Sequence, residues 1–482
     1  MDDSEIVLGL ITTLGTDTEN VIRFMKDHLS KFSYTTELIN VSSEILLPFE
    51  KNETEITFHS EYDRIKYFMD LGDDVRRKTE DTAIVTKGVA AHILEKRDSI
   101  EDPSPREKVA YIIKSIKHPD EADYLKKVYG DGFHLIGITS DLDTRKRFLT
   151  EVKNMTEEQA SLLMTRDADD NDDFGQHTQD AFQNSDYFIS VGNDIDDIRN
   201  SVFRLIDLLF GNPFITPTFE EYAMFMAYSA SIRSADLSRQ IGAVITKDNE
   251  ILSTGVNDCP KYSGGLYWQI HNNSQYYDEP SGRDYMLGYD SNKSEQNKII
   301  KKILDNLGLN DTLENQKKIK KAGISSLTEY GRVVHAEMEA IISCARNNIS
   351  SKGSVMYATT FPCHNCAKHI IAAGIKKVVY IEPYPKSKAT KFYQQEISVN
   401  NIDFEKKVVF VPFSGVGPRR YIDLFAMSSS KWGQKIRKDK QGNKIEWKRE
   451  TAKVRNPMSP LSYLDCEKAA YLSYFDEIKG ED

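Results

Sequence analysis

Two short segments constrain the fold of this chain more than any other feature: HAE at 335–337 and PCHNC at 362–366. One imidazole and two thiolates give Zn²⁺ three protein ligands and leave the fourth tetrahedral position open for water. A structural zinc site is normally closed by a fourth Cys or His, so an open site is typical of catalysis. The sequence therefore predicts a fold in which three side chains meet around one Zn²⁺: His335, Cys363 and Cys366.

Glu337 follows the predicted histidine ligand by two residues and is predicted to be the catalytic group that carries protons without binding the metal. Residues two apart point to opposite sides of a regular helix. His335 and Glu337 can therefore both face one metal only if the helix predicted over 335–346 begins at about His335.

The second segment is predicted to lie at a junction between a strand and a helix. Residues 353–361 (GSVMYATTF) are rich in β-branched and aromatic side chains, which favours a buried strand. Pro362 then suits the first helical position, where no backbone N–H is needed. Cys363 and Cys366 would share one face of the first helical turn, where the helix dipole favours thiolates.

The order H-x-E, then P-C-x-x-C, is typical of zinc-dependent nucleobase deaminases. The runs GAVITKDNEILSTGVNDCP (242–260) and YATTFPCHNCAKHIIAAGIKKVVYIEPYP (357–385) resemble the deoxycytidylate deaminase family. The similarity covers about 213–427, with a long insertion at 260–330. It implies a cytidine-deaminase-like αβα fold with a mixed sheet, in which Zn²⁺ is the cofactor and Glu337 the proton shuttle.

The chain order agrees with that fold. A helix is expected at 219–233, before the two zinc helices and the strand between them. The further strands are expected at 242–246, 251–256, 377–382 and 408–412.

Substrate contacts are predicted on loops around the zinc segments. Asn257, in Gly-Val-Asn-Asp, resembles the family asparagine that contacts the sugar and orients the pyrimidine, although a turn role is the alternative. Asp258 stands where family members have glycine, so this loop departs from the family pattern. The remaining candidates are one aromatic and four basic side chains that suit a 5′-phosphorylated substrate: Tyr384, Lys386, Lys388, Arg419 and Arg420.

Residues 1–212 are predicted to form a separate α/β domain, and 213–482 the deaminase domain. A strand at 5–14, a glycine turn, a helix at 19–32 and a strand at 34–41 open a βαβ unit with a parallel sheet. More strands are expected at 109–115, 134–139 and 186–191, alternating with helices at 120–128 and 195–210. This pattern looks like a P-loop or nucleotide-kinase fold.

The first glycine turn is predicted to be a degenerate P-loop. The motif G-x-x-x-x-G-K-[ST] would need a lysine and a hydroxyl after its second glycine. Here Gly9 and Gly15 have five residues between them, and Thr16 and Asp17 follow. Because these residues cannot supply the lysine or the metal-bound hydroxyl, a folding, assembly or binding role is favoured over phosphoryl transfer.

Composition limits the classes of protein that fit. The 482 residues are too many for one core, so two or three domains are expected. No apolar run is long enough to span a bilayer, and acids stand where a signal peptide has positive charge. Five cysteines, two of them assigned to zinc, suggest a cytoplasmic protein with reduced thiols. A net charge of −11 argues against a general nucleic-acid surface, except over the basic region 430–455, for which a solvated hairpin or arm is favoured.

Almost the whole chain resembles bacterial anti-phage deaminases that fuse a kinase-like domain to a deoxycytidylate deaminase. The runs LGLITTLGTDTENV, IKHPDEADYLKKVYGDGFHLIGI and HAEMEAI carry this resemblance. It implies depletion of dCTP and dCMP, a homo-oligomer such as a hexamer, and an inhibitory partner such as a small RNA.

Three function classes remain open. The chain could be a free-nucleotide deaminase, in defence or in ordinary dTMP supply. It could instead edit cytosine or adenine in a nucleic acid, with aromatics of the insertion stacking the bases. It could also be a nucleotide-binding regulator with an inert deaminase fold, although the complete ligand set and Glu337 disfavour that class.

Overall fold

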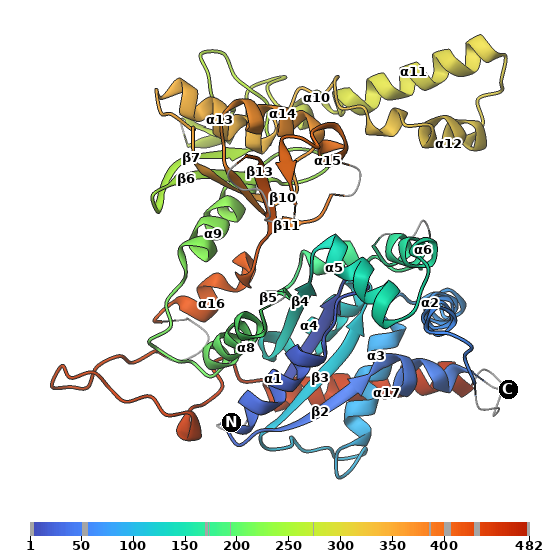
Figure 1. Cartoon of the computed structure of the whole chain (residues 1–482), viewed down its shortest axis with the longest axis vertical. Coiled ribbons are helices and arrows are strands. Elements are labelled where there is room, and N and C mark those ends of the chain that lie inside the picture. Colours follow the sequence, from blue (N-terminus) through green and yellow to red (C-terminus); the bar gives the residue numbers. More distant parts are fainter. Residues whose placement is uncertain are drawn as a thin grey trace. The chain divides into compact units, whose positions relative to one another are not determined.

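The computed structural model describes residues 4–50, 56–168, 172, 174–192, 194–272, 274–384, 387–399, 406–428 and 434–479. The chain divides into two compact units (Figure 1). The first unit contains 1–221 and 413–482, and the second contains 222–412. The sequence had suggested that 213–482 form one domain, whereas the structure groups 413–482 with the N-terminal residues. No helix among the described residues is long and apolar enough to cross a membrane.

A six-stranded sheet forms the centre of the first unit, in the order β14-β5-β4-β1-β3-β2. Strands β1 to β5 are mutually parallel and β14 pairs antiparallel to β5. The strands are β1 (Ile6–Thr12), β2 (Thr35–Asn40), β3 (Val109–Ile116), β4 (Phe133–Thr139), β5 (Tyr187–Ser190) and β14 (Gly415–Val416). The predicted parallel α/β domain is confirmed, while its likeness to P-loop kinases stays a prediction.

The composition of β1 explains its central place. Its sequence IVLGLIT is buried over the first six residues, as expected of a parallel strand covered on both faces. Gly9 is needed there, because a Cβ would lie 2.5 Å from the Ile116 side chain and 2.8 Å from the Phe133 ring.

Helices cover both faces of this sheet. On one face, α1 (Glu19–Ser30) and α8 (Ile195–Leu209) bury Met25, Leu29, Val202 and Leu205 in the main core cluster. The other helices of this unit are α2 (Glu61–Lys78), α3 (Ile84–Glu95), α4 (Pro119–Tyr129), α5 (Leu142–Arg147), α6 (Glu157–Ala168), α7 (Thr178–Phe182), α16 (Tyr421–Phe425) and α17 (Pro460–Lys479).

A buried ionic cluster joins the C-terminal helix to the first strand. The Arg97 guanidinium donates to Glu5 Oε1 at 3.0 Å and to Glu467 Oε2 at 2.7 Å, and all three side chains are at most 1% exposed. Tyr463 also donates to Glu5 at 2.6 Å, and Tyr474 donates to Ile45 O at 2.6 Å. These contacts explain why 413–482 belongs to this unit.

The basic region also packs on the first unit. The isolated bridge between Lys438 and Lys444 makes a hairpin of the described part, as expected for an arm. It is not solvated throughout, since Lys435 is buried and donates to Leu424 O, and burial lowers its pKa to about 8.

The second unit contains a mixed six-stranded sheet, in the order β12-β13-β11-β10-β6-β7. Pairs β6–β7 and β10–β6 are antiparallel, whereas β10–β11 and β11–β13 are parallel. The strands are β6 (Gly242–Lys247), β7 (Glu250–Val256), β10 (Val355–Thr360), β11 (Lys377–Glu382), β12 (Ile397–Ser398) and β13 (Val408–Pro412). The expected mixed sheet is therefore confirmed.

Three helices pack closely on this sheet. The helix α9 (Phe219–Ser231) runs so near Gly242 that a Cβ there would meet Ala227 O at 1.9 Å. The helices α13 (Ala336–Arg346) and α14 (His364–Ala372) share a core with β6 and β10. A short helix, α15 (Ala389–Phe392), follows β11.

The insertion has its own elements and is fixed by ion pairs. It holds β8 (Ile270–Asn272), β9 (Gln275–Tyr277), α10 (Asp284–Leu287), α11 (Ser291–Leu307) and α12 (Leu313–Lys321). Asp258, the residue that departs from the family glycine, is 1% exposed and lies 3.1 Å from the Arg283 guanidinium. Arg332 in turn donates to Asp284 at 3.0 Å. The carboxylate at 258 therefore holds the insertion against the end of β7.

Replacing Arg97 by Met should destabilise the first unit, because Glu5 and Glu467 would remain buried without a cation. Removing one partner of a buried ion pair costs about 3–5 kcal/mol. Denaturant unfolding monitored by circular dichroism would measure the loss. Arg199→Met on α8, where Arg199 pairs with Asp196 at the surface, is the control and should stay within about 0.5 kcal/mol. If Arg97→Met and Arg199→Met lowered the free energy of unfolding by the same small amount, the cluster would not hold the C-terminal helix.

Candidate active site

The three predicted zinc ligands meet in the second unit. The ligand atoms of His335, Cys363 and Cys366 all lie within 4.8 Å of one another. His335 Nδ1 is 3.3 Å from Cys366 Sγ and 3.4 Å from Cys363 Sγ, and the two sulfurs are 3.6 Å apart. Tetrahedral Zn²⁺ would place nitrogen and sulfur about 3.6 Å apart and two sulfurs about 3.8 Å apart. The set therefore fits one Zn²⁺ with little movement.

Both ligand segments lie at helix N-termini. His335 is the N-cap of α13 with an extended backbone (φ −68°, ψ 151°), which confirms the predicted helix start. Cys363 is the N-cap of α14 and its sulfur accepts the Cys366 N–H at 3.4 Å. Pro362 precedes that cap, so its expected place as first helical residue was wrong. The thiolate rather than the proline begins this helix, because its sulfur satisfies a backbone donor of the first turn.

The electrostatics of the set favour metal binding. The hydrogen bond from the Cys366 thiol lowers the pKa of Cys363 to about 4. The hydrogen bond to Cys363 raises the pKa of His335 to about 9. A metal ion would displace the protons that Cys366 and His335 hold here, so its affinity should fall as the pH falls.

Glu337 lies in the first turn of α13 and is only 4% exposed. Burial raises its pKa, and the nearby Cys363 thiolate adds to the rise. A raised pKa makes this carboxylate a stronger proton acceptor than an exposed glutamate, and its acid form can return the proton. Beside a metal ligand set, this is the chemistry of a proton carrier.

The side-chain amide of Asn257 holds the backbone just before β6 through two hydrogen bonds. Its Oδ1 accepts the Ile241 N–H at 2.7 Å, and its Nδ2 donates to Arg239 O at 2.7 Å. Each end of an amide can make one more hydrogen bond. The predicted sugar contact is therefore compatible with this geometry, and it stays a prediction.

The basic loop after β11 lies close to the second zinc segment. Ser387 Oγ donates to Pro362 O at 2.8 Å, and burial raises the pKa of the half-buried Tyr384. Lys388 is exposed at the start of α15. Lys386 lies outside the described residues.

The two predicted arginines belong to the first unit. Arg419 is exposed there, whereas Arg420 is 3% exposed. Arg420 donates to Asp131 O at 2.9 Å and to His134 Nδ1 at 3.1 Å, and lies 3.2 Å from Asp423. Its charge is therefore already neutralised by carboxylates, which does not favour the phosphate role predicted for it.

Sequence reasoning missed Arg239, which pairs with the buried Glu382. Glu382 also accepts the Thr360 hydroxyl at 2.8 Å. The sequence signal was the pair of neighbouring strands predicted at 242–246 and 251–256: if they form a hairpin, the residues before the first and after the second must meet, and Gly242 does pair with Val256. That strand pairing places the backbone of Arg239 next to Asn257.

Residues 217–382 match the family model described as cytidine and deoxycytidylate deaminase zinc-binding region. The deoxycytidylate deaminase of Enterobacteria phage T2 is 36% identical over 165 residues, which are 34% of this chain and 79% of that protein. The deoxycytidylate deaminase of Mus musculus is 27% identical over 190 residues, 39% of this chain and 78% of that protein. The crystal structure of dCMP deaminase from the cyanophage S-TIM5 in complex with dCMP and dUMP is 21% identical in sequence to this chain. The match covers 41% of this chain and 98% of the phage protein. Its TM-score is 0.24, and no conclusion is drawn from it.

Replacing Cys363 by Ala should abolish zinc binding, because two ligands remain and the N-cap of α14 is lost as well. Metal analysis by inductively coupled plasma mass spectrometry should find about one zinc per chain in the parent protein and little in the variant. Cys344→Ala is the control, since Cys344 is buried elsewhere and hydrogen-bonds Ser253. Full zinc retention by Cys363→Ala would overturn the ligand assignment.

Proposed function

We propose that this chain, which belongs to the deoxycytidylate deaminase family, hydrolyses free deoxycytidine nucleotides to the corresponding deoxyuridine nucleotides and ammonia. The observation that carries the proposal is the convergence of His335, Cys363 and Cys366 beside the buried carboxyl of Glu337. Bound Zn²⁺ would supply hydroxide at neutral pH.

Glu337 performs the proton transfers in this proposal. Hydrolysis adds water across the double bond between C4 and N3 of the cytosine ring and removes the amino group as ammonia. Protons must therefore reach ring N3 and the leaving nitrogen. Glu337 delivers both, because its raised pKa lets it accept a proton from water and return it. Its burial keeps these protons from exchanging with bulk water.

The substrate is proposed to be dCMP, dCTP or both. Lys388 would attract the phosphate groups as an ammonium point charge, and the same role is proposed for Lys386 from the sequence alone. Asn257 would contact the sugar through the hydrogen bond that each end of its amide still has available. The phosphate contact predicted for Arg419, an exposed residue of the first unit, stays a prediction.

The biological role is proposed from the resemblance of the whole chain to anti-phage deaminases. Depletion of deoxycytidine nucleotides during infection would follow from the proposed reaction, in a cytoplasmic homo-oligomer such as a hexamer. An inhibitory partner such as a small RNA would restrain the enzyme before infection. The same chemistry would also suit ordinary dTMP supply.

A second candidate function rests on exposed aromatics of the insertion. Tyr262 is 96% exposed, Tyr276 71% and Trp268 61%. Arg233 covers one face of Trp268 and His271 one face of Tyr276. Their other faces and the Tyr262 ring would stack single-stranded bases in this candidate. Conversion of cytosine or adenine in a single-stranded oligonucleotide, but not in free nucleotides, would favour this candidate.

Glu337→Gln should retain zinc and nucleotide binding while losing turnover, because the amide keeps the shape and cannot shuttle protons. General acid–base catalysis contributes about 10²–10⁴ in rate. Ammonia release, zinc content and binding of dCMP would be measured on the same preparation. Glu339→Gln, on the same helix and paired with Arg346, is the control. Turnover near that of the parent protein would show that another group carries the proton.

A further inference from the structure

The segment 327–334, at the end of the insertion, adjoins both halves of the zinc ligand set. It ends directly before His335, the N-cap of α13. Near its start, the Thr328 hydroxyl accepts a hydrogen bond from the side-chain amide of Asn365 at 3.3 Å. Asn365 lies between the two cysteine ligands in the chain. One short segment therefore leads into the histidine ligand and contacts the loop that carries the two thiolates.

The backbone of this segment lies in turns and irregular chain. The exception is an isolated bridge, in which the Val334 N–H donates to Asp258 O at 3.0 Å. An N-cap residue has a non-helical backbone, so α13 does not by itself fix the direction of the His335 side chain. That direction depends on the contacts that hold 327–334 in place.

The side chain of Arg332 ties the segment to the start of α10. Its Nη1 donates to Asp284 Oδ1 at 3.0 Å, and its Nη2 donates to Ser281 O at 3.0 Å and to Gly282 O at 2.9 Å. Asp284 is the first residue of α10 and is 6% exposed. The guanidinium offers its donors in a rigid planar fork, so three acceptors on the insertion fix its position.

The N-cap of α10 holds the other side of the same bridge. Arg283 lies 3.1 Å from the Asp258 carboxylate and donates to Tyr267 O at 2.6 Å. Asp258 is also the residue whose carbonyl accepts the Val334 N–H. Two adjacent residues, Arg283 and Asp284, thus hold the two chain segments that meet in that bridge.

The first turns of α11 hold the other end of the segment. The side-chain amides of Asn292 and Gln296 donate to Leu327 O at 2.8 and 2.7 Å. The Ser291 hydroxyl donates to Tyr330 O at 3.0 Å. The insertion therefore holds the segment at both ends, beside the contact with the cysteine loop and beside the histidine.

The place of these contacts indicates a role other than core packing. None of the described residues of 260–330 belongs to the hydrophobic cluster that α13 and α14 share with the sheet. No residue of α12 is buried, and α11 and α12 extend from the base of the insertion (Figure 1). The polar contacts of the insertion gather instead at the segment that enters the zinc site.

We propose that the insertion positions the zinc ligands, with Arg332 and Thr328 as its positioning residues. The proposal rests on the zinc site of the proposed function. Groups that hold metal ligands in place are typically worth about 10–100-fold in metal affinity or activity, because a ligand that can turn away releases its metal more easily. Glu337 follows His335 by two residues, so the same contacts set where the proton carrier stands relative to the ligands.

The rate of zinc release from the full-length protein would test this role. Each zinc-loaded protein is mixed with an excess of a chromogenic chelator, and the appearance of colour is followed. Arg332→Met should release zinc about 10–100 times faster than the parent protein. Thr328→Val removes only the hydroxyl and should release it about fivefold faster, the worth of one neutral hydrogen bond. Thr254→Val, at an exposed position of β7, is its control and should match the parent.

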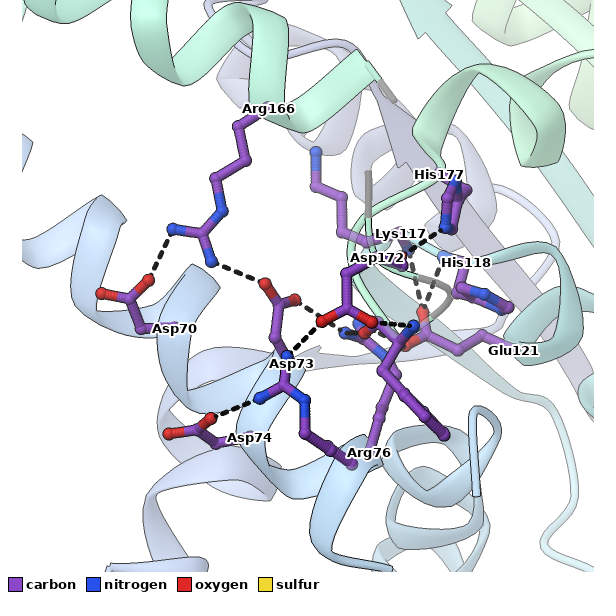
Figure 2. A network of polar contacts seen from close by, with 12 residues as sticks. Asp70, Asp73, Asp74, Arg76, Lys117, His118, Glu121, Arg166, Asp172 and His177 are labelled. Carbon is purple, nitrogen blue, oxygen red and sulfur yellow. Dashed lines mark hydrogen bonds and ion pairs between the residues drawn. The ribbon is translucent and has the colours of Figure 1, made fainter. Parts of the chain in front are cut away.

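The matched control for Arg332→Met is Arg346→Met. Arg346 lies at the C-terminal end of α13 and pairs with Glu339 at 2.9 Å, and its side chain is 34% exposed, against 35% for Arg332. Arg166→Met is a control in the first unit, where Arg166 is partly buried and pairs with two aspartates of α2 (Figure 2). Both controls should release zinc at the parent rate.

A second readout separates positioning from stability. Co²⁺ in place of Zn²⁺ has visible absorption bands that depend on the arrangement of its ligands. These bands should shift or weaken in Arg332→Met, and Arg332→Lys, which can still pair with Asp284, should restore them in part. Thermal unfolding should change by similar amounts in Arg332→Met and Arg346→Met, because each loses an ion pair of equal exposure.

Two results would overturn the positioning role: zinc release at the parent rate by both Arg332→Met and Thr328→Val, or equal acceleration by Arg346→Met. A parent protein that binds no zinc would contradict the ligand assignment and the positioning role together. A parent protein that binds zinc and deaminates no nucleotide would contradict the proposed function alone, because the release of metal is measured without substrate.

Discussion

The structure of the second unit depends on the meeting of two helix N-termini at one point. The α13 and α14 helices begin at His335 and Cys363, and each cap residue has an extended backbone that turns its side chain toward the other. The positive ends of both helix dipoles favour thiolates there. The strand β10 between them ends next to Cys363, so the buried sheet sets the distance between the ligands. Loss of that register would separate the metal ligands from one another and from Glu337.

The structure of the first unit depends in a similar way on one buried charge, the guanidinium of Arg97. Arg97 satisfies two carboxylates from opposite ends of the chain, Glu5 and Glu467. The cluster fixes the C-terminal helix to the first strand, which leads into the loop with Asp167 and Lys117. The stability of the sheet and the position of the loop after β1 are thus linked through that strand.

Local sequence features were sufficient for elements such as β1 and β10 and for the meeting of His335, Cys363 and Cys366. The apolar runs of β1 and β10 and the fixed spacing of Cys363 and Cys366 are properties of neighbouring residues, and each predicted the structure that formed. Arg420 shows the limit of such reasoning, because its charge is visible in the sequence and its partners are not. Those partners are acids 289 and three residues away.

Features that depend on distant partners could not be predicted. Arg97 meets Glu5 and Glu467 across separations of 92 and 370 residues, so no periodic pattern reveals that 413–482 returns to the first unit. Asp167 likewise reaches Leu14 across 153 residues, and the sequence shows only that the P-loop lysine is missing. The structure shows that Asp167 and Lys117, from other loops, contact the loop after β1.

The most direct measurement of the central claim is liquid chromatography of a panel of cytosine compounds after incubation with the zinc-loaded full-length protein. The panel contains dCMP, dCTP, CMP, CTP, deoxycytidine and a single-stranded oligonucleotide. We expect conversion of dCMP or dCTP to the matching deoxyuridine nucleotide, with little conversion of the nucleoside or the oligonucleotide. Conversion of the oligonucleotide alone, or of no compound while zinc is bound at His335, Cys363 and Cys366, would contradict it.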